Sequence, residues 1–261
     1  MNKHVASGMQ DVRLVGGQAV GSCHRARSVQ RAPFKTELHP GNLAQRDIPE
    51  PLASRPVRGP RATVEQIRET TNGDRRQLAC SLADAFMEDP VACWSAPSPA
   101  LRWKCLRRFF GAYLAIRVPM GLVWNDTKLV GAALWSPPGK GVTTTLEALR
   151  LASGYADPRL WPRGPLVGYG LLSVERLHPK APEHLYLATL GVRPSDQGRG
   201  LGSLLLRPAL ELCDRDGLSA YLEASKESNI AFYARHGFQV TRKIELPRGP
   251  TMYAMWREPH P

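Results

Sequence analysis

The glycine-rich segment Asp196-Gln-Gly-Arg-Gly-Leu-Gly-Ser203 constrains the fold most, because it joins an apolar run to a helix-like run. Residues 184–192 before it are apolar enough for a central strand that is covered on both faces. In residues 201–217 after it, leucines recur on one helical face. Three glycines within five residues let the backbone turn tightly and approach a ligand closely. The start of a helix favours anions, so the segment predicts an anion site between strand and helix.

The spacing of these glycines narrows the choice of anion. Ser203 stands where a dinucleotide-binding GxGxxG motif needs its third glycine. No Gly-Lys-Ser or Gly-Lys-Thr completes a nucleoside triphosphate loop either. The spacing therefore disfavours NAD and nucleoside triphosphates.

The other predicted elements surround this segment in mixed order. Alternating or apolar runs predict strands at 62–69, 121–125, 129–135, 218–224, 238–245 and 251–256. Helical spacing predicts helices at 72–89, 99–118, 142–155, 164–178, 201–217 and 229–236. Asp89-Pro90 is expected to end the first helix, and glycines weaken the prediction for 164–178. The order predicts one α+β (or α/β) domain over residues 62–258, with a partly parallel central sheet flanked by helices.

Residues 1–61 differ from the rest in composition. They hold ten Lys or Arg against four Asp or Glu, together with six Pro, and they lack a sustained period. This composition predicts a disordered, basic, Pro-rich tail. A targeting segment, a binding tail and an extension from an upstream start codon all stay open. Nucleic acid is a disfavoured partner because the tail contains no known RNA-binding or DNA-binding motif.

Cysteine and histidine spacing bears on metals and on the compartment. The five cysteines include no CxxC pair, and the seven histidines form no HxxxH or HExxH motif, so no metal site is expected. Unpaired, widely spaced cysteines are typical of free thiols in a reducing compartment, and the predicted location is cytoplasmic. No apolar run reaches the ~18 residues of a membrane span, so no membrane partner is expected.

The glycine segment and the residues after it resemble the GCN5-related N-acetyltransferase (GNAT) family. Gln197-x-x-Gly200-x-Gly202 matches that family's [RQ]-x-x-G-x-[GA] pattern, and a Val-x-Pro turn at 192–194 precedes it. Residues 222–225 and the segment 229–238, with Phe232-Tyr233, match the next strand and helix in order. The resemblance covers about residues 62–258, closely from 184 onward. In this half the chain is most similar to puromycin N-acetyltransferase-like members.

The resemblance implies an activity and its partners. It implies transfer of an acetyl group from acetyl-CoA, the acyl-donor co-substrate, to the primary amine of a small molecule such as an antibiotic or metabolite. A protein or peptide amine is an alternative acceptor, and a non-catalytic CoA-binding regulator is an alternative of another class. A homodimer also stays open.

The resemblance also implies how the donor is held. The central strand is expected to splay from its neighbour, so that the backbone of Leu190, Gly191 and Val192 meets the pantetheine arm. The pyrophosphate is expected on the loop, with Arg193 and Arg199 as charge partners. The loop residues implied are Gln197, Gly198, Arg199, Gly200, Leu201 and Gly202. Asn229 either touches the pantetheine amide or caps its helix.

Two side chains are candidates for catalysis. Tyr233 is the candidate general acid for the departing thiolate, with a core tyrosine as the alternative. A phenol of pKa ~10 and a thiol of pKa ~8.5 make that transfer uphill by only about 2 kcal/mol. Glu223 is the candidate base for the incoming ammonium, with a structural hydrogen-bonded role as the alternative. Trp124, Trp135 and Tyr155 either wall an aromatic acceptor pocket or belong to the core.

Overall fold

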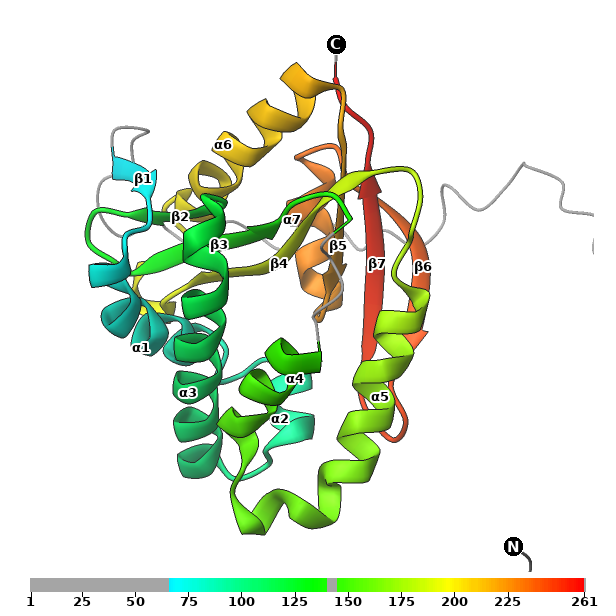
Figure 1. Ribbon diagram of the computed structural model, residues 1–261. Coiled ribbons are helices and arrows are strands. Elements are labelled where there is room, and N and C mark those ends of the chain that lie inside the picture. The colour runs from blue at the N-terminus through cyan, green and yellow to red at the C-terminus, as the bar shows by residue number, and fades with distance from the viewer. Residues whose placement is uncertain (1–65, 140–144, 261) are drawn as a thin grey trace, which may run out of the picture. The chain divides into compact units, whose positions relative to one another are not determined.

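The computed structural model describes residues 66–139 and 145–260, which form a seven-stranded sheet with helices on both faces (Figure 1). Its strands run in the order β1-β2-β3-β4-β5-β7-β6, and only the β4–β5 pair is parallel. The strands are β1 (Ile67–Glu69), β2 (Val123–Asp126), β3 (Gly131–Ser136), β4 (His184–Val192), β5 (Ser219–Ala224), β6 (Gln239–Glu245) and β7 (Thr251–Arg257). The predicted mixed, partly parallel sheet is confirmed.

The helices divide between the two faces of the sheet. They are α1 (Arg75–Ala85), α2 (Pro90–Ser95), α3 (Pro99–Arg117), α4 (Thr145–Ala152), α5 (Gly164–Leu177), α6 (Leu201–Asp216) and α7 (Ile230–Ala234). One core cluster joins α6 to the sheet through Leu205, Leu206 and Leu222. A second cluster joins α1 and α3 to the opposite face through Leu78 and Phe110. Because apolar residues alternate between the faces of β3 and β4, both faces can be buried.

The segment after α1 differs from the prediction. Asp89-Pro90 was expected to end the first helix, but α1 already ends at Ala85, and the pair instead begins α2, which the sequence pattern did not predict. Asp89 Oδ1 accepts hydrogen bonds from the amides of Val91 and Ala92, at 2.9 and 3.1 Å. Proline at the first helical position loses no intrahelical bond, so an Asp-Pro pair can start a helix as well as stop one.

Other boundaries shifted by a turn or less. The first helix begins at Arg75 because residues 72–74 form a 3₁₀ turn, and the predicted helix 229–236 is reduced to α7. The strand expected at 62–69 is observed as β1, while 62–65 lie outside the described residues. The tail at 1–61 and positions 142–144 of a predicted helix also lie outside them. The glycines within α5 did not prevent its formation.

A bidentate ion pair joins β1 to the turn before α1. Both Arg68 Nη atoms lie 2.8 Å from the Asp74 carboxylate oxygens, and the Thr71 amide also donates to it. The hydrogen bonds from Arg68 hold the pKa of Asp74 well below its usual value, although burial opposes them. A carboxyl with a depressed folded-state pKa stabilises the fold above the unfolded pKa of ~3.9, and that stability is lost as the pH falls.

We expect Asp74→Asn to lower the free energy of unfolding by about 1 kcal/mol at pH 7, since Arg68 is partly exposed and solvent screens the pair. The difference from wild type should shrink as the pH falls below 4, because the Asp74 carboxyl of the unfolded wild-type chain then takes up a proton that the folded state does not yet bind. Urea unfolding at several pH values measures both effects. Glu211→Gln, at an exposed pair with Arg207, is the matched control and should change stability less. An equal loss at pH 3 and pH 7 would contradict the assignment.

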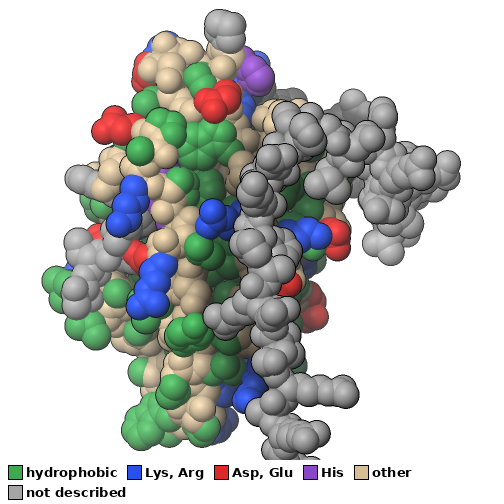
Figure 2. Space-filling model, turned by 90° about the vertical axis from the view of Figure 1, so that its right-hand side faces the viewer, with side chains coloured by type: hydrophobic (Ala, Val, Ile, Leu, Met, Phe, Trp, Pro, Cys, Tyr) green, Lys and Arg blue, Asp and Glu red, His purple; other side chains and the backbone are tan. Residues whose placement is uncertain are grey.

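Exposed apolar side chains lie on the outer face of α4 and α5 and on the turn between them. Figure 2 shows this side of the molecule, where hydrophobic and Lys or Arg side chains are interspersed. The most exposed of these side chains are Leu146, Leu149, Trp161, Tyr169 and Leu172. Within the described part of the chain, no helix combines the length and hydrophobicity needed to cross a membrane.

Candidate active site

A cleft of about 470 Å³ opens where β4 and β5 separate. The two strands pair only from His184 with Ser219 to Leu187 with Leu222, although β4 continues to Val192 beside β3. The splay that the family resemblance implied is therefore present. The first turn of α6, the short helix α7 and the end of α1 form the other walls.

The free edge of β4 directs backbone groups into this cleft. The amide of Arg193 donates to Val130 O at 2.8 Å, which places its backbone groups toward β3. Neighbouring residues of an extended strand direct their backbone groups to opposite edges, so the amides of Leu190 and Val192 point toward the cleft. Gly191 lines the cleft between them, and a Cβ at this position would lie only 2.8 Å from Leu82 Cδ2 on α1.

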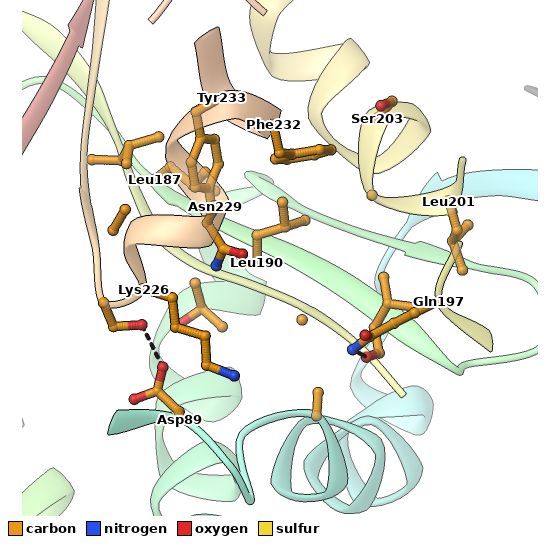
Figure 3. A pocket seen from close by; sticks show the side chains of 18 of the residues that line it. Asp89, Leu187, Leu190, Gln197, Leu201, Ser203, Lys226, Asn229, Phe232 and Tyr233 are labelled. Carbon is orange, nitrogen blue, oxygen red and sulfur yellow. Dashed lines mark hydrogen bonds between the residues drawn. The ribbon is translucent and has the colours of Figure 1, made fainter. Parts of the chain in front are cut away.

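Gln197 secures the glycine loop to the end of β4. Its side-chain Nε2 donates to Val192 O at 2.8 Å (Figure 3). The side chain of Gln197 thus holds the loop in place, and the backbone of the loop is left to face the cleft.

Gly198 and Gly200 give the loop its shape. Their φ angles are 77° and 85°, in the left-handed region where a Cβ is unfavourable, and Gly200 is the N-cap of α6. Nothing lies within 4 Å of the Cβ position of either glycine, so the loop is open toward a ligand. The amides of Leu201 and Gly202, in the first turn of α6, have no carbonyl one helical turn earlier. This arrangement fits the pyrophosphate of a coenzyme A molecule.

The charged side chains near the loop are arranged differently from the expectation. Arg193 and Arg199 both lie near Asp196, with N–O distances of 3.9 and 3.5 Å, and neither is among the residues that line the cleft. Lys226 and Arg235 do line it, and Figure 3 shows the Lys226 side chain extending into it. Sequence reasoning missed these two cations, although Arg235 lies within the matched segment 229–238 and Lys226 lies three residues before it.

Tyr233 lies on α7 and faces the cleft next to Phe232 (Figure 3). It is largely buried, within the same core cluster as α6. Burial raises the pKa of Tyr233 well above its usual value of 10, and the Asp89 carboxylate raises it further. The phenol is therefore protonated at neutral pH. However, full proton transfer from this phenol to a thiolate is more uphill than the usual pKa values indicate.

Asp89 is a buried carboxylate at the cleft that sequence reasoning treated only as a helix boundary. Its Oδ2 accepts a hydrogen bond from Oγ of Ser225, the residue that directly follows β5 (Figure 3). Asp89 thereby joins α2 to β5 as well as capping α2.

Asn229 is at the N-cap position of α7, yet in the described structure its side chain makes no capping hydrogen bond. It lines the cleft below Tyr233 instead (Figure 3). The capping alternative for Asn229 is wrong, because the preceding 3₁₀ turn at Glu227–Asn229 leads the chain into α7 without it.

Glu223 reaches the cleft from the face of the sheet opposite to the one on which Tyr233 lies. The apolar neighbours of Glu223 along β5 face α6, whereas its own side chain is 3% exposed and faces the end of α5. Its Oε1 lies 3.5 Å from His178 Nδ1 and has no hydrogen-bond partner among the residues described. Burial raises the pKa of Tyr186 and Tyr221, and the charge of Glu223 raises both further, so these phenols stay protonated beside it.

The three aromatic residues considered for an acceptor wall do not line the cleft. Trp135 is fully buried and Trp124 packs against the same core beneath α6. Tyr155 packs against a small cluster that includes Cys105. None of the three walls this cleft, because Trp135 lies wholly in the core and the other two are partly buried against core clusters. Among the described residues no group of His, Cys, Asp and Glu could hold a metal ion.

Comparison with known proteins agrees with the geometry of the cleft. Residues 80–238 match the acetyltransferase (GNAT) family. The chain belongs to this family. It is thus an acyltransferase, and acetyl-CoA is its acyl donor.

Relatives of this acetyltransferase include proteins from several organisms. An uncharacterised N-acetyltransferase of Schizosaccharomyces pombe is 27% identical over 187 residues, which are 67% of this chain and 74% of the relative. The N-alpha-acetyltransferase RimI of Mycobacterium tuberculosis is 36% identical over 100 residues, which are 36% of this chain and 61% of RimI. A crystal structure from Corynebacterium glutamicum, described as histone acetyltransferase HPA2 and related acetyltransferase, has a TM-score of 0.56. The Corynebacterium protein is 26% identical to this chain. The match covers 75% of this chain and 97% of the Corynebacterium chain.

Proposed function

We propose that this acetyltransferase transfers the acetyl group of acetyl-CoA to the primary amine of a small molecule, such as an antibiotic or a metabolite. One observation carries the proposal: Glu223 and Tyr233 approach the same gap between β4 and β5 from opposite faces of the sheet. A thioester held in that gap would have a carboxylate on one side and a phenol on the other.

The donor would be held mainly by backbone groups. The amides of Leu190 and Val192 suit the pantetheine arm, and an amide at this edge would polarise the thioester carbonyl. Gly191 keeps the strand free of a side chain there, and Asn229 suits the amide groups of the arm. The loop from Gln197 through Gly198, Arg199, Gly200 and Leu201 to Gly202 would hold the pyrophosphate with its amides. Lys226 and Arg235 supply positive charge at the cleft.

The two candidate catalytic residues would divide the proton transfers. Glu223 would accept a proton from the incoming ammonium, since a neutral amine is the nucleophile. Tyr233 would donate to the departing thiolate. Because its pKa is raised, we infer that Tyr233 stabilises the thiolate first through a hydrogen bond, and completes the transfer only as negative charge builds on sulfur.

A protein or peptide N-terminus is a second candidate acceptor, because one relative carries the name N-alpha-acetyltransferase. The resemblance of the chain from residue 184 onward to puromycin N-acetyltransferase-like members supports a small-molecule amine, and it names no particular acceptor. The cytoplasmic location and the homodimer remain predictions.

Measuring free CoA released from acetyl-CoA tests the proposed function. The panel of acceptors should include polyamines, arylalkylamines, puromycin, aminoacyl nucleosides and short peptides with a free N-terminus. We expect turnover with at least one small primary amine, and none when its nitrogen is blocked. Turnover confined to peptides would favour the second candidate, whereas CoA binding without release from any acceptor would favour a regulator.

A further inference from the structure

A chain of buried polar side chains extends from Glu223 to the loop before β4. His178, which follows α5, lies with Nδ1 3.5 Å from Glu223 Oε1 and with Nε2 3.2 Å from His184 Nε2. The other ring nitrogen of His184, Nδ1, lies 2.9 Å from Pro182 O. Glu223, at one end of this chain, lines the cleft, while the other end is a backbone carbonyl.

The partners of each nitrogen determine where the protons are. A carbonyl oxygen only accepts, so His184 Nδ1 must carry a proton. Burial lowers the pKa of His184, so its ring is neutral and its Nε2 has a lone pair. The contact between the two rings then requires that His178 Nε2 donates. In a neutral His178 ring, Nδ1 is consequently a lone pair that faces the Glu223 carboxylate.

When the His178 ring is neutral, its contact with Glu223 therefore lacks one proton. A lone pair and a carboxylate oxygen, both acceptors, face each other at 3.5 Å in a buried place. One proton would convert this repulsion into a charge-assisted hydrogen bond. The site thus has a specific capacity to receive one proton.

We propose that His178 and Glu223 act together as the proton acceptor for the ammonium of the acyl acceptor. The inference rests on the proposed function. Glu223 contacts the ammonium, one N–H bond of which breaks, and the electron pair stays on nitrogen. The proton ends between Glu223 Oε1 and His178 Nδ1, and the neutral amine attacks the thioester carbonyl. His178 is a positioning residue that acts through Glu223, and His184 holds its ring in the required tautomer.

The titratable and charged groups packed around this pair come from β4, β5, α3 and β6. The Tyr186 and Tyr221 rings lie edge-on to His178 at 4.7 and 4.9 Å, and both phenols stay protonated. From α3, Tyr113 is also buried, and its ring faces the Arg117 guanidinium. From β6, the charge of Arg242 acts on Tyr221.

A pH profile of kcat/KM tests the pair through activity. In His178→Gln, the side-chain amide can still donate a hydrogen bond to His184, but the Nδ1 lone pair that faces Glu223 is lost. We expect kcat/KM at pH 7 to fall about tenfold, since Glu223 still serves as a base and such bases contribute roughly 10²- to 10⁴-fold. The acidic limb of the profile should move to lower pH by at least about one unit.

Glu223→Gln should lower kcat/KM by at least about a hundredfold. The double variant should lower kcat/KM no further than Glu223→Gln alone. His260→Gln, at an exposed histidine, is the matched control and should leave the profile unchanged.

A ¹⁵N NMR spectrum of the imidazoles tests the pair without any acceptor. At high pH we expect the proton on Nδ1 in His184 and on Nε2 in His178, and as the pH falls a proton should appear on Nδ1 of His178. In Glu223→Gln that proton should appear only at lower pH. The opposite tautomers, or an unmoved acidic limb in His178→Gln, would overturn the inference. Correct tautomers without turnover of any amine would instead count against the proposed function.

Discussion

Tyr233→Phe is expected to lower kcat by at least about a hundredfold, because a positioned acid contributes roughly 10²- to 10⁴-fold. The Tyr233 phenol faces the cleft from α7 and is held protonated by burial and by the nearby Asp89 carboxylate. The substitution removes one hydroxyl and leaves the ring in the core cluster, so acetyl-CoA should still bind. Single-turnover kinetics and CoA titration separate the two effects.

The control for this variant is Tyr253→Phe. Tyr253 is buried in the same core cluster but does not line the cleft, so its loss of a hydroxyl should leave kcat within about twofold. Normal turnover in Tyr233→Phe would remove this residue from the mechanism. A loss of CoA binding in Tyr233→Phe would assign it a structural role.

Gly200→Ala is expected to weaken acetyl-CoA binding at least about tenfold. Gly200 has a φ of 85°, and a Cβ in the left-handed region costs about 1–2 kcal/mol. Since no atom lies within 4 Å of that Cβ position, the effect would come from the backbone, which relieves the strain by moving the first amides of α6. Isothermal titration with CoA measures the loss, and desulfo or phosphate-lacking analogues would locate it at the pyrophosphate.

Gly217→Ala is the matched control at the other end of the same helix. Gly217 has a φ of 66° and equally open space, so its substitution should destabilise the fold by a similar amount. It lies far along α6 from the cleft and should leave CoA affinity unchanged. Equal losses of affinity in the two variants would show that helix stability, and not the loop, governs binding.

The local features of the site could be predicted from neighbouring residues in the amino-acid sequence. The glycines at 198, 200 and 202 predicted the anion-binding turn, because a left-handed backbone and a helix start are properties of neighbouring residues. The apolar pattern of 184–192 predicted β4, and the leucines of 201–217 predicted α6, to within a residue or two. The resemblance of residues 222–225 and 229–238 to the family identified Glu223 and Tyr233 as candidates.

What those residues face depends on how the chain packs. The splay of β4 from β5 depends on where strand pairing stops, and pairing joins residues distant in sequence. His178 precedes Glu223 by 45 positions, and no periodicity connects them, yet folding buries them together. Local sequence also did not predict where Trp135 and Lys226 lie. Trp135 is buried in the core, and Lys226 lines the cleft. Burial and proton affinity are set by all neighbours in space, and that set exists only after the chain has packed.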